Sequence, residues 1–181
     1  RRMDAVITTS AAAASYLDHP PDIIIPHGVD EAVYKPADSK CNAWAQLGFP
    51  GKYGIGIFGR VRKQKGIDIL IEAAIPVLKH YEDFTVIICG EITPNNQKFA
   101  EQLKQLVLEA GLADRILFIG KQPFERLPLL FRSMSIVAAV SRNEGFGLTV
   151  LEAMASGTAV VASEAGAWKE IIGDHSFGAC V

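Results

Sequence analysis

Two glutamates eight positions apart frame the stretch with the clearest chemical content, Glu144-Gly-Phe-Gly-Leu-Thr-Val-Leu-Glu152. The glycines between them predict a turn that opens a helix. Such a turn exposes free backbone N–H groups and the positive end of the helix dipole, which together bind phosphate. Carboxylates on either side of the phosphate can accept hydrogen bonds from sugar hydroxyls. The pattern therefore predicts a ligand with phosphate between two sugars, which describes a nucleotide-sugar.

A plainer interpretation is that Glu152 is a surface residue of this helix and Glu144 a turn residue. Against it, the neighbours of Glu152 in the predicted helix 148–155 are mostly apolar. A carboxylate in a mostly buried helix needs a partner. We therefore favour a functional role for both glutamates.

A second candidate site follows a predicted buried strand and reads Gly59-Arg60-Val-Arg62-Lys63-Gln-Lys65-Gly66. A solvated turn would also account for its charges, because Lys and Arg are common in loops. In a functional interpretation, the forked guanidinium of Arg60 binds phosphate oxygens and Lys65 adds a point charge. The flanking glycines let the backbone approach the ligand. The loop would then stabilise the negative charge that develops on a departing diphosphate.

The same region contains a misleading match to the dinucleotide-binding pattern, Gly54-Ile-Gly56-Ile-Phe-Gly59. That pattern functions only at the turn between a strand and a helix. Here the first two glycines fall inside the predicted strand 53–58, and the next helix begins several residues after the third. Binding of NAD through this match is therefore disfavoured.

Composition sets broad limits on function. The 181 residues are 49% hydrophobic and 21% charged, as in a globular domain, and the net charge of -2 argues against a general nucleic-acid binder. No apolar run reaches the length of a membrane span. The cysteines are odd in number and widely spaced, which favours reduced thiols and gives no metal-site spacing; they are Cys41, Cys89 and Cys180.

Strand-like and helix-like segments alternate along the chain. Strands are predicted over 4–8, 53–58, 84–89, 115–119, 136–140, 159–162 and 178–181, and helices over 10–17, 66–79, 96–110, 125–132 and 148–155. The Pro- and Gly-rich stretch 20–36 is interpreted as a linker. This alternation predicts an α/β fold with a mainly parallel sheet and helices on both faces. Ligands of such sheets bind at the carboxyl ends of the strands, where both candidate sites fall.

Both ends of the sequence look interrupted. It begins Arg1-Arg2-Met3 directly before an apolar stretch, and it ends within the strand predicted over 178–181. We expect a fragment of a longer protein, although a purification tag or ragged ends would look the same.

Together the motifs resemble the retaining glycosyltransferases of family 4, also called glycosyl transferase group 1, which have the GT-B fold. Residues 144–157 are similar to the family signature E-G-F-G-L-x-x-x-E-A-M-A-x-G, and residues 59–66 to G-R-x-x-x-x-K-G. Residues 25–30, Ile-Pro-His-Gly-Val-Asp, are similar to the linker signature I-P-x-G-V-D. The matches run from about residue 23 to residue 170. Their wording is nearest to bacterial enzymes that build lipopolysaccharide core, including mannosyltransferases.

The resemblance implies a role for each matching position. Glu144 would hold the transferred sugar, Glu152 would bind the ribose hydroxyls, and Arg60 and Lys65 would neutralise the leaving diphosphate. The remaining donor-binding positions are Gly59, Gly145, Phe146, Gly147 and Leu148 around the diphosphate, and Glu91 and Lys121 near the nucleobase. The family needs no metal or other cofactor. The donor would be a UDP- or GDP-sugar.

The resemblance also implies a Rossmann-like domain that forms the C-terminal half of a two-domain enzyme. Residues 1–30 would be the end of the acceptor domain and the linker, with His27 in a structural role, and residues 31–181 a donor-binding domain truncated at its C-terminus. The acceptor, a saccharide or a lipid-linked glycan, would bind the missing first domain. The fragment alone would bind donor weakly and catalyse nothing. The whole enzyme would be cytoplasmic, at the inner face of the membrane.

Three other functions stay open at this point. A nucleotide-sugar epimerase of similar fold would consume donor without an acceptor. A glycoside hydrolase would use Glu144 and Glu152 as its acid and nucleophile, which gives the charged loop 59–66 no role. A non-catalytic nucleotide-sugar binding module would keep the site and lack activity.

Overall fold

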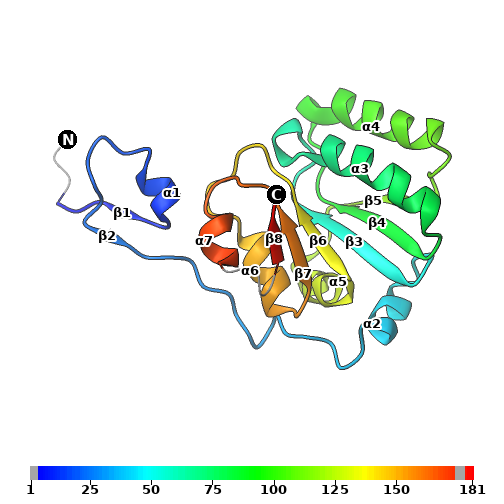
Figure 1. Ribbon diagram of the computed structural model, residues 1–181, viewed down its shortest axis with the longest axis horizontal. Coiled ribbons are helices and arrows are strands. Elements are labelled where there is room, and N and C mark those ends of the chain that lie inside the picture. Colours follow the sequence, from blue (N-terminus) through cyan, green and yellow to red (C-terminus); the bar gives the residue numbers. More distant parts are fainter. Residues whose placement is uncertain (1–3, 174–177) are drawn as a thin grey trace.

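A six-stranded parallel sheet forms the centre of the molecule (Figure 1). The computed structural model describes residues 4–173 and 178–181, so the predicted start at residues 1–3 lies outside the described residues. The strand order is β5-β4-β3-β6-β7-β8, and every neighbouring pair is parallel. The strands are β3 (Tyr53–Phe58), β4 (Phe84–Cys89), β5 (Ile116–Gly120), β6 (Ile136–Ala139), β7 (Ala159–Ala162) and β8 (Gly178–Cys180). The predicted α/β fold class is confirmed.

Helices cover both faces of this sheet, as predicted. One face carries α3 (Ile67–His80) and α4 (Gln97–Glu109); the other carries α2 (Lys40–Leu47), α5 (Leu127–Ser133), α6 (Leu148–Ala155) and α7 (Trp168–Ile172). Single 3-10 turns occur at Lys63–Lys65, Pro94–Asn96 and Phe124–Arg126. None of the helices in residues 4–173 and 178–181 is long and apolar enough to cross a membrane.

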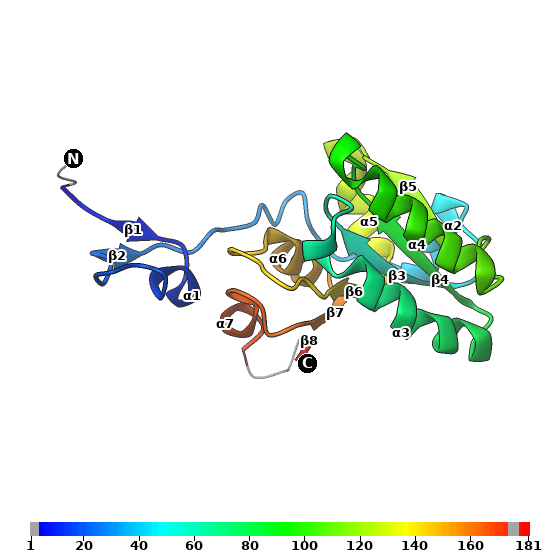
Figure 2. The ribbon, with the colours of Figure 1, turned by 90° about the horizontal axis from the view of Figure 1, so that it is seen from above.

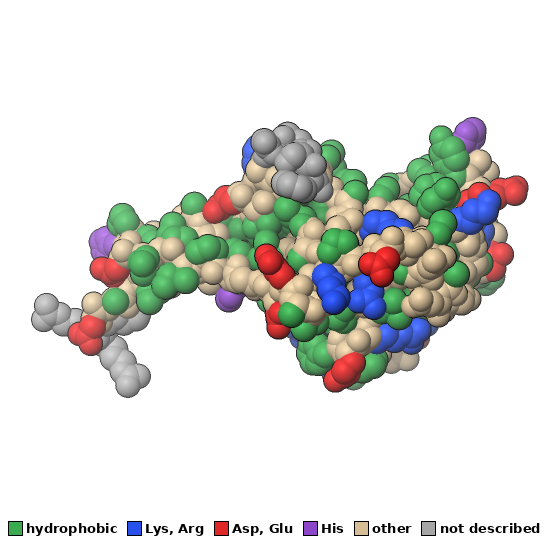
Figure 3. All heavy atoms as spheres, turned by 90° about the horizontal axis from the view of Figure 1, so that it is seen from below, with side chains coloured by type: hydrophobic (Ala, Val, Ile, Leu, Met, Phe, Trp, Pro, Cys, Tyr) green, Lys and Arg blue, Asp and Glu red, His purple; other side chains and the backbone are tan. Residues whose placement is uncertain are grey.

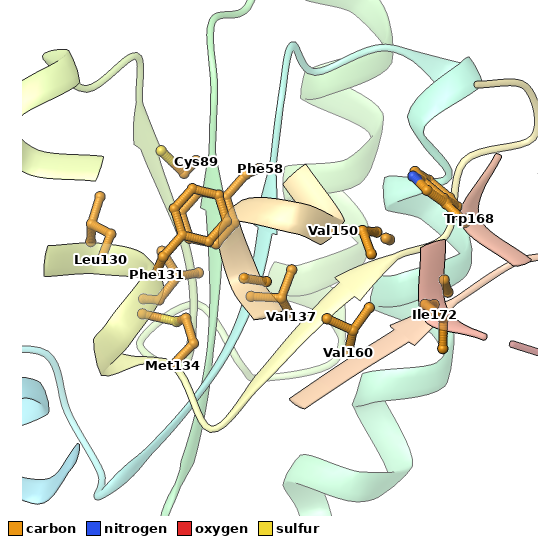
Figure 4. Packing of buried hydrophobic residues seen from close by; sticks show 14 of the residues in the cluster. Phe58, Cys89, Leu130, Phe131, Met134, Val137, Val150, Val160, Trp168 and Ile172 are labelled. Carbon is orange, nitrogen blue, oxygen red and sulfur yellow. The ribbon is translucent and has the colours of Figure 1, made fainter. Parts of the chain in front are cut away.

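The two faces have separate hydrophobic cores because side chains alternate along each strand. In β4, Val86 and Ile88 belong to the core under α3 and α4, whereas Ile87 and Cys89 belong to the other core. Figure 4 shows this second core, in which Phe58 and Phe131 stack with their ring centroids 4.0 Å apart.

The glycines of β3 account for the misleading dinucleotide pattern. Gly54 and Gly56 lie inside β3, as predicted, and are buried there. A Cβ on Gly54 would overlap the ring of Trp44 in α2, and a Cβ on Gly56 would lie 2.9 Å from Cγ of Met134. These glycines therefore let α2 and the chain after α5 pack directly on the strand.

A separate two-stranded parallel sheet precedes the main one. It consists of β1 (Ile7–Thr8) and β2 (Ile23–Ile24), joined through α1 (Ala11–Ala14), and it projects to one side of the main sheet (Figures 1 and 2). Ser10 caps α1, as predicted, by accepting a hydrogen bond from the N–H of Ala13 at 2.9 Å. The strand is shorter than the predicted 4–8, the helix ends at Ala14 instead of residue 17, and β2 lies within the predicted linker.

Apolar side chains remain exposed on this projecting part. Hydrophobic atoms (green) cover much of it in Figure 3, and the exposed residues include Ile7, Tyr16, Ile23, Ile24 and Ile25. Two strands of two residues each bury too little surface to form a core of their own.

Candidate functional site

The strand order places the candidate site at the point where the topology reverses. From β3 the chain runs outward to β4 and β5, and then returns to add β6 on the other side of β3. The loops after β3 and β6 therefore diverge to opposite sides and leave a crevice between their carboxyl ends, where ligands of open α/β sheets bind. The cation loop 59–66 follows β3, and the glycine loop 144–147 follows β6. Both predicted sites thus meet at one place.

A cleft of about 370 Å³ opens at this edge of the sheet. Its lining includes seven positions singled out by the sequence: Gly59, Arg60, Lys65, Glu91, Lys121, Leu148 and Glu152. Phe58, Cys89, Gly90, Gln122, Phe124, Leu127 and Thr149 complete the lining. Another hollow, of about 460 Å³, lies between the chain before α2 and Arg132 and is lined by none of the predicted site residues.

Lys65 and Glu144 connect the two loops directly. The Lys65 ammonium donates to Oε2 of Glu144 at 2.5 Å, and the Ser141 hydroxyl donates to the same oxygen at 3.4 Å. The other carboxylate oxygen accepts from the N–H of Gly145 at 3.3 Å. Both charged side chains are largely buried, with 17% and 15% of their surfaces exposed. These three contacts fix the carboxylate of Glu144 at the start of the glycine loop.

Arg142 forms a second link between the loops. Its guanidinium donates to both carboxylate oxygens of Asp68 at 2.7 and 2.8 Å, and also to the carbonyl oxygen of Lys63 at 2.7 Å. Its backbone N–H donates to the carbonyl oxygen of Gln64 at 2.8 Å. Burial alone would raise the pKa of Asp68, but the hydrogen bonds and charge of Arg142 outweigh it and hold that pKa below its ordinary value. The cation loop is therefore anchored to the chain after β6.

The glycine loop leads into α6 as expected. Gly147 is the N-cap with φ +84°, so it has no side chain to accept from the N–H groups of the first turn. Leu148, the first helical residue, is 44% exposed at the cleft. Free N–H groups and the positive end of the helix dipole suit this end of α6 to bind an anion. Four predicted site residues are not part of the cleft lining: Glu144, Gly145, Phe146 and Gly147. The ring of Phe146 instead meets His27 of the linker edge-on, with centroids 4.9 Å apart.

Glu152 lies one turn further along α6 with Tyr34 as its partner. Burial raises the pKa of Glu152 above its ordinary value, and a hydrogen bond from Tyr34 partly opposes that rise. Burial, the charge of Glu152 and the same hydrogen bond raise the pKa of Tyr34 to about 12. Tyr34 therefore stays protonated and orients the carboxylate.

The outer end of the cleft is formed by the loops after β4 and β5. Glu91 and Lys121 are both exposed there, beside the exposed ring of Phe124. Deeper in the cleft, burial raises the pKa of the Cys89 thiol to about 11. Across residues 4–173 and 178–181, no group of three or more His, Cys, Asp or Glu side chains is placed to hold a metal ion.

Sequence reasoning missed several residues of this site. Tyr34 and Ser141 contact the two glutamates, Thr149, Gln122 and Phe124 line the cleft, and Arg142 ties the loops together. Arg142 and Ser141 carried a usable signal, because both directly follow a strand that ends at the ligand-binding edge. No sequence signal pointed to Tyr34, because it lies far from Glu152 along the chain.

The parallel α/β sheet, with helices on both faces and a topology that reverses at β3 and β6, is a domain of the Rossmann type. The family described as "Glycosyl transferases group 1" matches residues 43–181, and the chain belongs to this family. The predicted family and the Rossmann-like domain of the GT-B fold are thereby confirmed.

Individual relatives agree with this assignment. The chain is 46% identical over 181 residues to the lipopolysaccharide core biosynthesis mannosyltransferase LpcC of Rhizobium leguminosarum bv. viciae, covering 100% of this chain and 51% of that protein. The chain thus spans about half the length of the curated relatives that it matches.

Solved structures give the same result. The C-terminal domain of a glycosyl transferase group 1 family protein (LpcC) from Francisella tularensis is 47% identical with a TM-score of 0.78, covering 85% of this chain and 80% of that one. Anabaena Alr3699/HepE, solved in complex with UDP-glucose, is 28% identical with a TM-score of 0.86, covering 100% of this chain and 50% of that one.

Proposed function

We propose that the whole protein is a retaining hexosyltransferase, and that residues 31–181 supply its nucleotide-sugar binding domain. The observation that carries this proposal is the meeting of Arg60, Lys65 and the N-terminus of α6 at one cleft. Glu152 lines this cleft, and Glu144 lies beside it, paired with Lys65. Cations and free N–H groups suit a diphosphate, and Glu144 and Glu152 suit the sugars on its two sides.

In this proposal the diphosphate lies between the cation loop and α6. Arg60 and Lys65, together with the N–H groups that follow Gly147, stabilise the negative charge that develops as the hexose departs. These groups need no metal ion for that task. Glu152 accepts from the ribose hydroxyls, and the base occupies the outer end of the cleft near Glu91 and Lys121.

Glu144 takes the hexose end of the donor. Its carboxylate is already hydrogen-bonded by Lys65 and Ser141, so it is suited to orient sugar hydroxyls rather than to attack carbon. Retention of the anomeric configuration is what the resemblance to the retaining family implies. Without a covalent nucleophile, retention requires that the acceptor attacks from the face that the diphosphate leaves.

The acceptor side of the reaction lies outside this chain in the same proposal. Residues 1–30 are the end of the acceptor domain and the linker, and the fragment alone is inactive. A lipopolysaccharide core acceptor and a mannose donor are favoured by the name of the Rhizobium relative. Three free cysteines match a reducing compartment, and we place the enzyme in the cytoplasm at the inner face of the membrane.

Calorimetric titration of the chain with UDP, GDP and inorganic pyrophosphate tests the anion site. Arg60→Ala is expected to weaken binding of each by about tenfold or more, because one charge-assisted contact to phosphate is lost. Lys79→Ala, an exposed lysine in the last turn of α3, is the matched control and should bind as the unaltered chain does. Equal affinity of the Arg60 and Lys79 variants would exclude the diphosphate clamp.

The whole protein tests the reaction itself. Incubation with the preferred nucleotide-sugar and a lipopolysaccharide core acceptor should give the glycosylated acceptor with retained configuration and release the nucleoside diphosphate. Consumption of donor without transfer would instead support the epimerase, and binding without either would support a non-catalytic module.

A further inference from the structure

Trp168 lies directly beneath the glycine loop. It is the first residue of α7 and is 1% exposed. Gly147, with φ +84°, rests against its indole so closely that a Cβ would overlap the ring nitrogen and lie 2.7 Å from Cε2. The loop therefore has a rigid aromatic surface under it, and only glycine fits at the point of contact.

The chain that leads into Trp168 supports the same loop from a second position. Gly166, with φ +59°, packs against the carbonyl groups of Glu144 and Gly145, and a Cβ there would overlap the first of them. Just before it, the Ser163 hydroxyl donates to the carbonyl oxygen of Ser141 at 2.6 Å. The segment 163–168 thus forms a second layer behind the loop that follows β6.

The indole N–H of Trp168 points toward this loop rather than into the core. Figure 4 shows the ring nitrogen on the side away from Ile172. Within residues 4–173 and 178–181, Nε1 is buried and donates no hydrogen bond. The ring also lines a small cavity together with Lys65, Ser141 and Thr149, which adjoins the cleft. A buried donor without a partner calls for an explanation, and a role in ligand binding is one.

We propose that Trp168 is a positioning residue for the diphosphate-binding loop. Its ring packs against Gly147 and fixes the position of the loop, so that the N–H groups at the start of α6 point into the cleft. Its N–H dipole adds to the positive potential at that helix end. The inference rests on the proposed function, because the loop must bind the diphosphate for its position to matter.

Tryptophan fluorescence tests this directly, since the chain has only one other tryptophan. Trp44 lies at the opposite end of β3, where its Nε1 donates to the carbonyl oxygen of Gly51 at 3.1 Å. The Trp44→Phe variant therefore reports on Trp168 alone. Titration with pyrophosphate, UDP or GDP should change its emission with the midpoint found by calorimetry. The Trp168→Phe variant, which reports on Trp44, should show no change.

Affinity gives the second readout. Trp168→Ala is expected to weaken binding of these probes by about tenfold, and Trp168→Phe to recover part of the loss because it keeps a ring under Gly147. Ile172→Ala is the matched control, because Ile172 is 2% exposed in the same helix and the same core. The three atoms nearest to a Cβ placed on Gly147 all belong to Trp168 instead. The Ile172→Ala variant should be less stable than the unaltered chain but should bind the three probes with the same affinity.

The outcomes separate the two proposals. Binding with unchanged Trp168 emission, or equal affinities of the Trp168→Ala and Ile172→Ala variants, would overturn the positioning role alone. If Trp168→Ala does not fold, the Trp168→Phe variant takes its place. The positioning role would then be overturned if Trp168→Phe binds as tightly as the unaltered chain and the emission of Trp168 does not change on binding. If the unaltered chain binds none of the three probes, the proposed function falls and this inference falls with it.

Discussion

The ammonium of Lys65 lies 2.5 Å from the carboxylate of Glu144, although the two residues are 79 positions apart. Each comes from a loop beside the switch point of the sheet, and each is mostly shielded from solvent. The cation that we assign to the diphosphate is therefore paired with the carboxylate that we assign to the hexose. A bound donor would have to share this pair or separate it, which couples the two halves of its binding site.

The ion pair of Lys65 and Glu144 should contribute to the free energy of unfolding. Lys65→Met leaves a largely buried carboxylate without its main partner and should lower the free energy of unfolding by about 1–3 kcal/mol. The double variant Lys65→Met/Glu144→Leu should lose less than the sum of the single variants, since neither charge is then left alone. Urea unfolding of all four proteins measures the coupling. Strict additivity would mean that the ion pair contributes nothing.

Much of this arrangement could be predicted from the sequence. The motifs identified both loops, because glycines and charged residues that directly follow buried strands are typical of ligand-binding loops, and β3 and β4 have the predicted bounds. Two helices were missed, for different reasons. Helix α2 is capped by Ser39, but it has a weak apolar pattern in which only Ala43 and Trp44 are buried. Helix α7 has five residues and depends on burial of Trp168 and Ile172.

Contacts between distant segments could not be predicted in the same way. The pairing of Lys65 with Glu144 follows from β6 lying beside β3, and strand order is not encoded in any single motif. The contact of Tyr34 with Glu152 requires the linker to return to α6. A single sequence gives the type of each element more reliably than the path of the chain between elements.

Glu144 is expected to act in transfer rather than in nucleotide binding. In the whole protein, Glu144→Ala should lower the rate of transfer by about 10²–10³, the cost of removing one group that stabilises the reacting state. Binding of UDP or GDP should survive, because neither carries the hexose. Turnover and calorimetric affinity are measured side by side, with Glu164→Ala on the exposed surface as control. Turnover at the unaltered rate would remove Glu144 from the reaction.

Nucleotide affinity should depend on the protonation of Glu152. Burial raises the pKa of this carboxyl, so it takes up a proton at higher pH than an ordinary glutamate and then loses acceptor capacity for ribose hydroxyls. Affinity for UDP or GDP should therefore decrease as the pH falls through that raised pKa. Tyr34→Phe removes the hydrogen bond that opposes the rise, so its transition should move to higher pH. Calorimetry across the acidic range measures both.

Protonation of Glu152 should also change the free energy of unfolding with pH, in a direction that its raised pKa determines. Because the folded state binds this proton more tightly than the unfolded state, Glu152 makes unfolding less favourable as the pH falls from above its raised pKa toward the ordinary value of 4.5. The Glu152→Gln variant should lack this contribution and should show no Glu152-linked change in affinity. An unchanged pH profile of affinity in this variant would assign the titration to another group.

Glu170 should hold the N-terminal part of the chain to the main sheet. Its carboxylate oxygens accept from the backbone N–H groups of Ala11 and Ala12 at 3.0 and 2.8 Å, at the start of α1. A carboxylate in that position caps the helix and interacts favourably with its dipole, an effect of about 1 kcal/mol. Because Glu170 belongs to α7, two residues after Trp168, this helix contacts α1 and the glycine loop at once.

Limited proteolysis with chymotrypsin measures this contact. Glu170→Ala should increase cleavage after Tyr16, which closely follows α1 and is 83% exposed, because release of α1 lets the segment enter the protease. Glu164→Ala is the control: its ion pair with Lys169, at 3.0 Å, is mostly exposed and contributes little. Equal cleavage of the two variants would show that α1 is held by other contacts. Faster cleavage confined to Glu170→Ala would identify this carboxylate as the contact that holds α1 against α7.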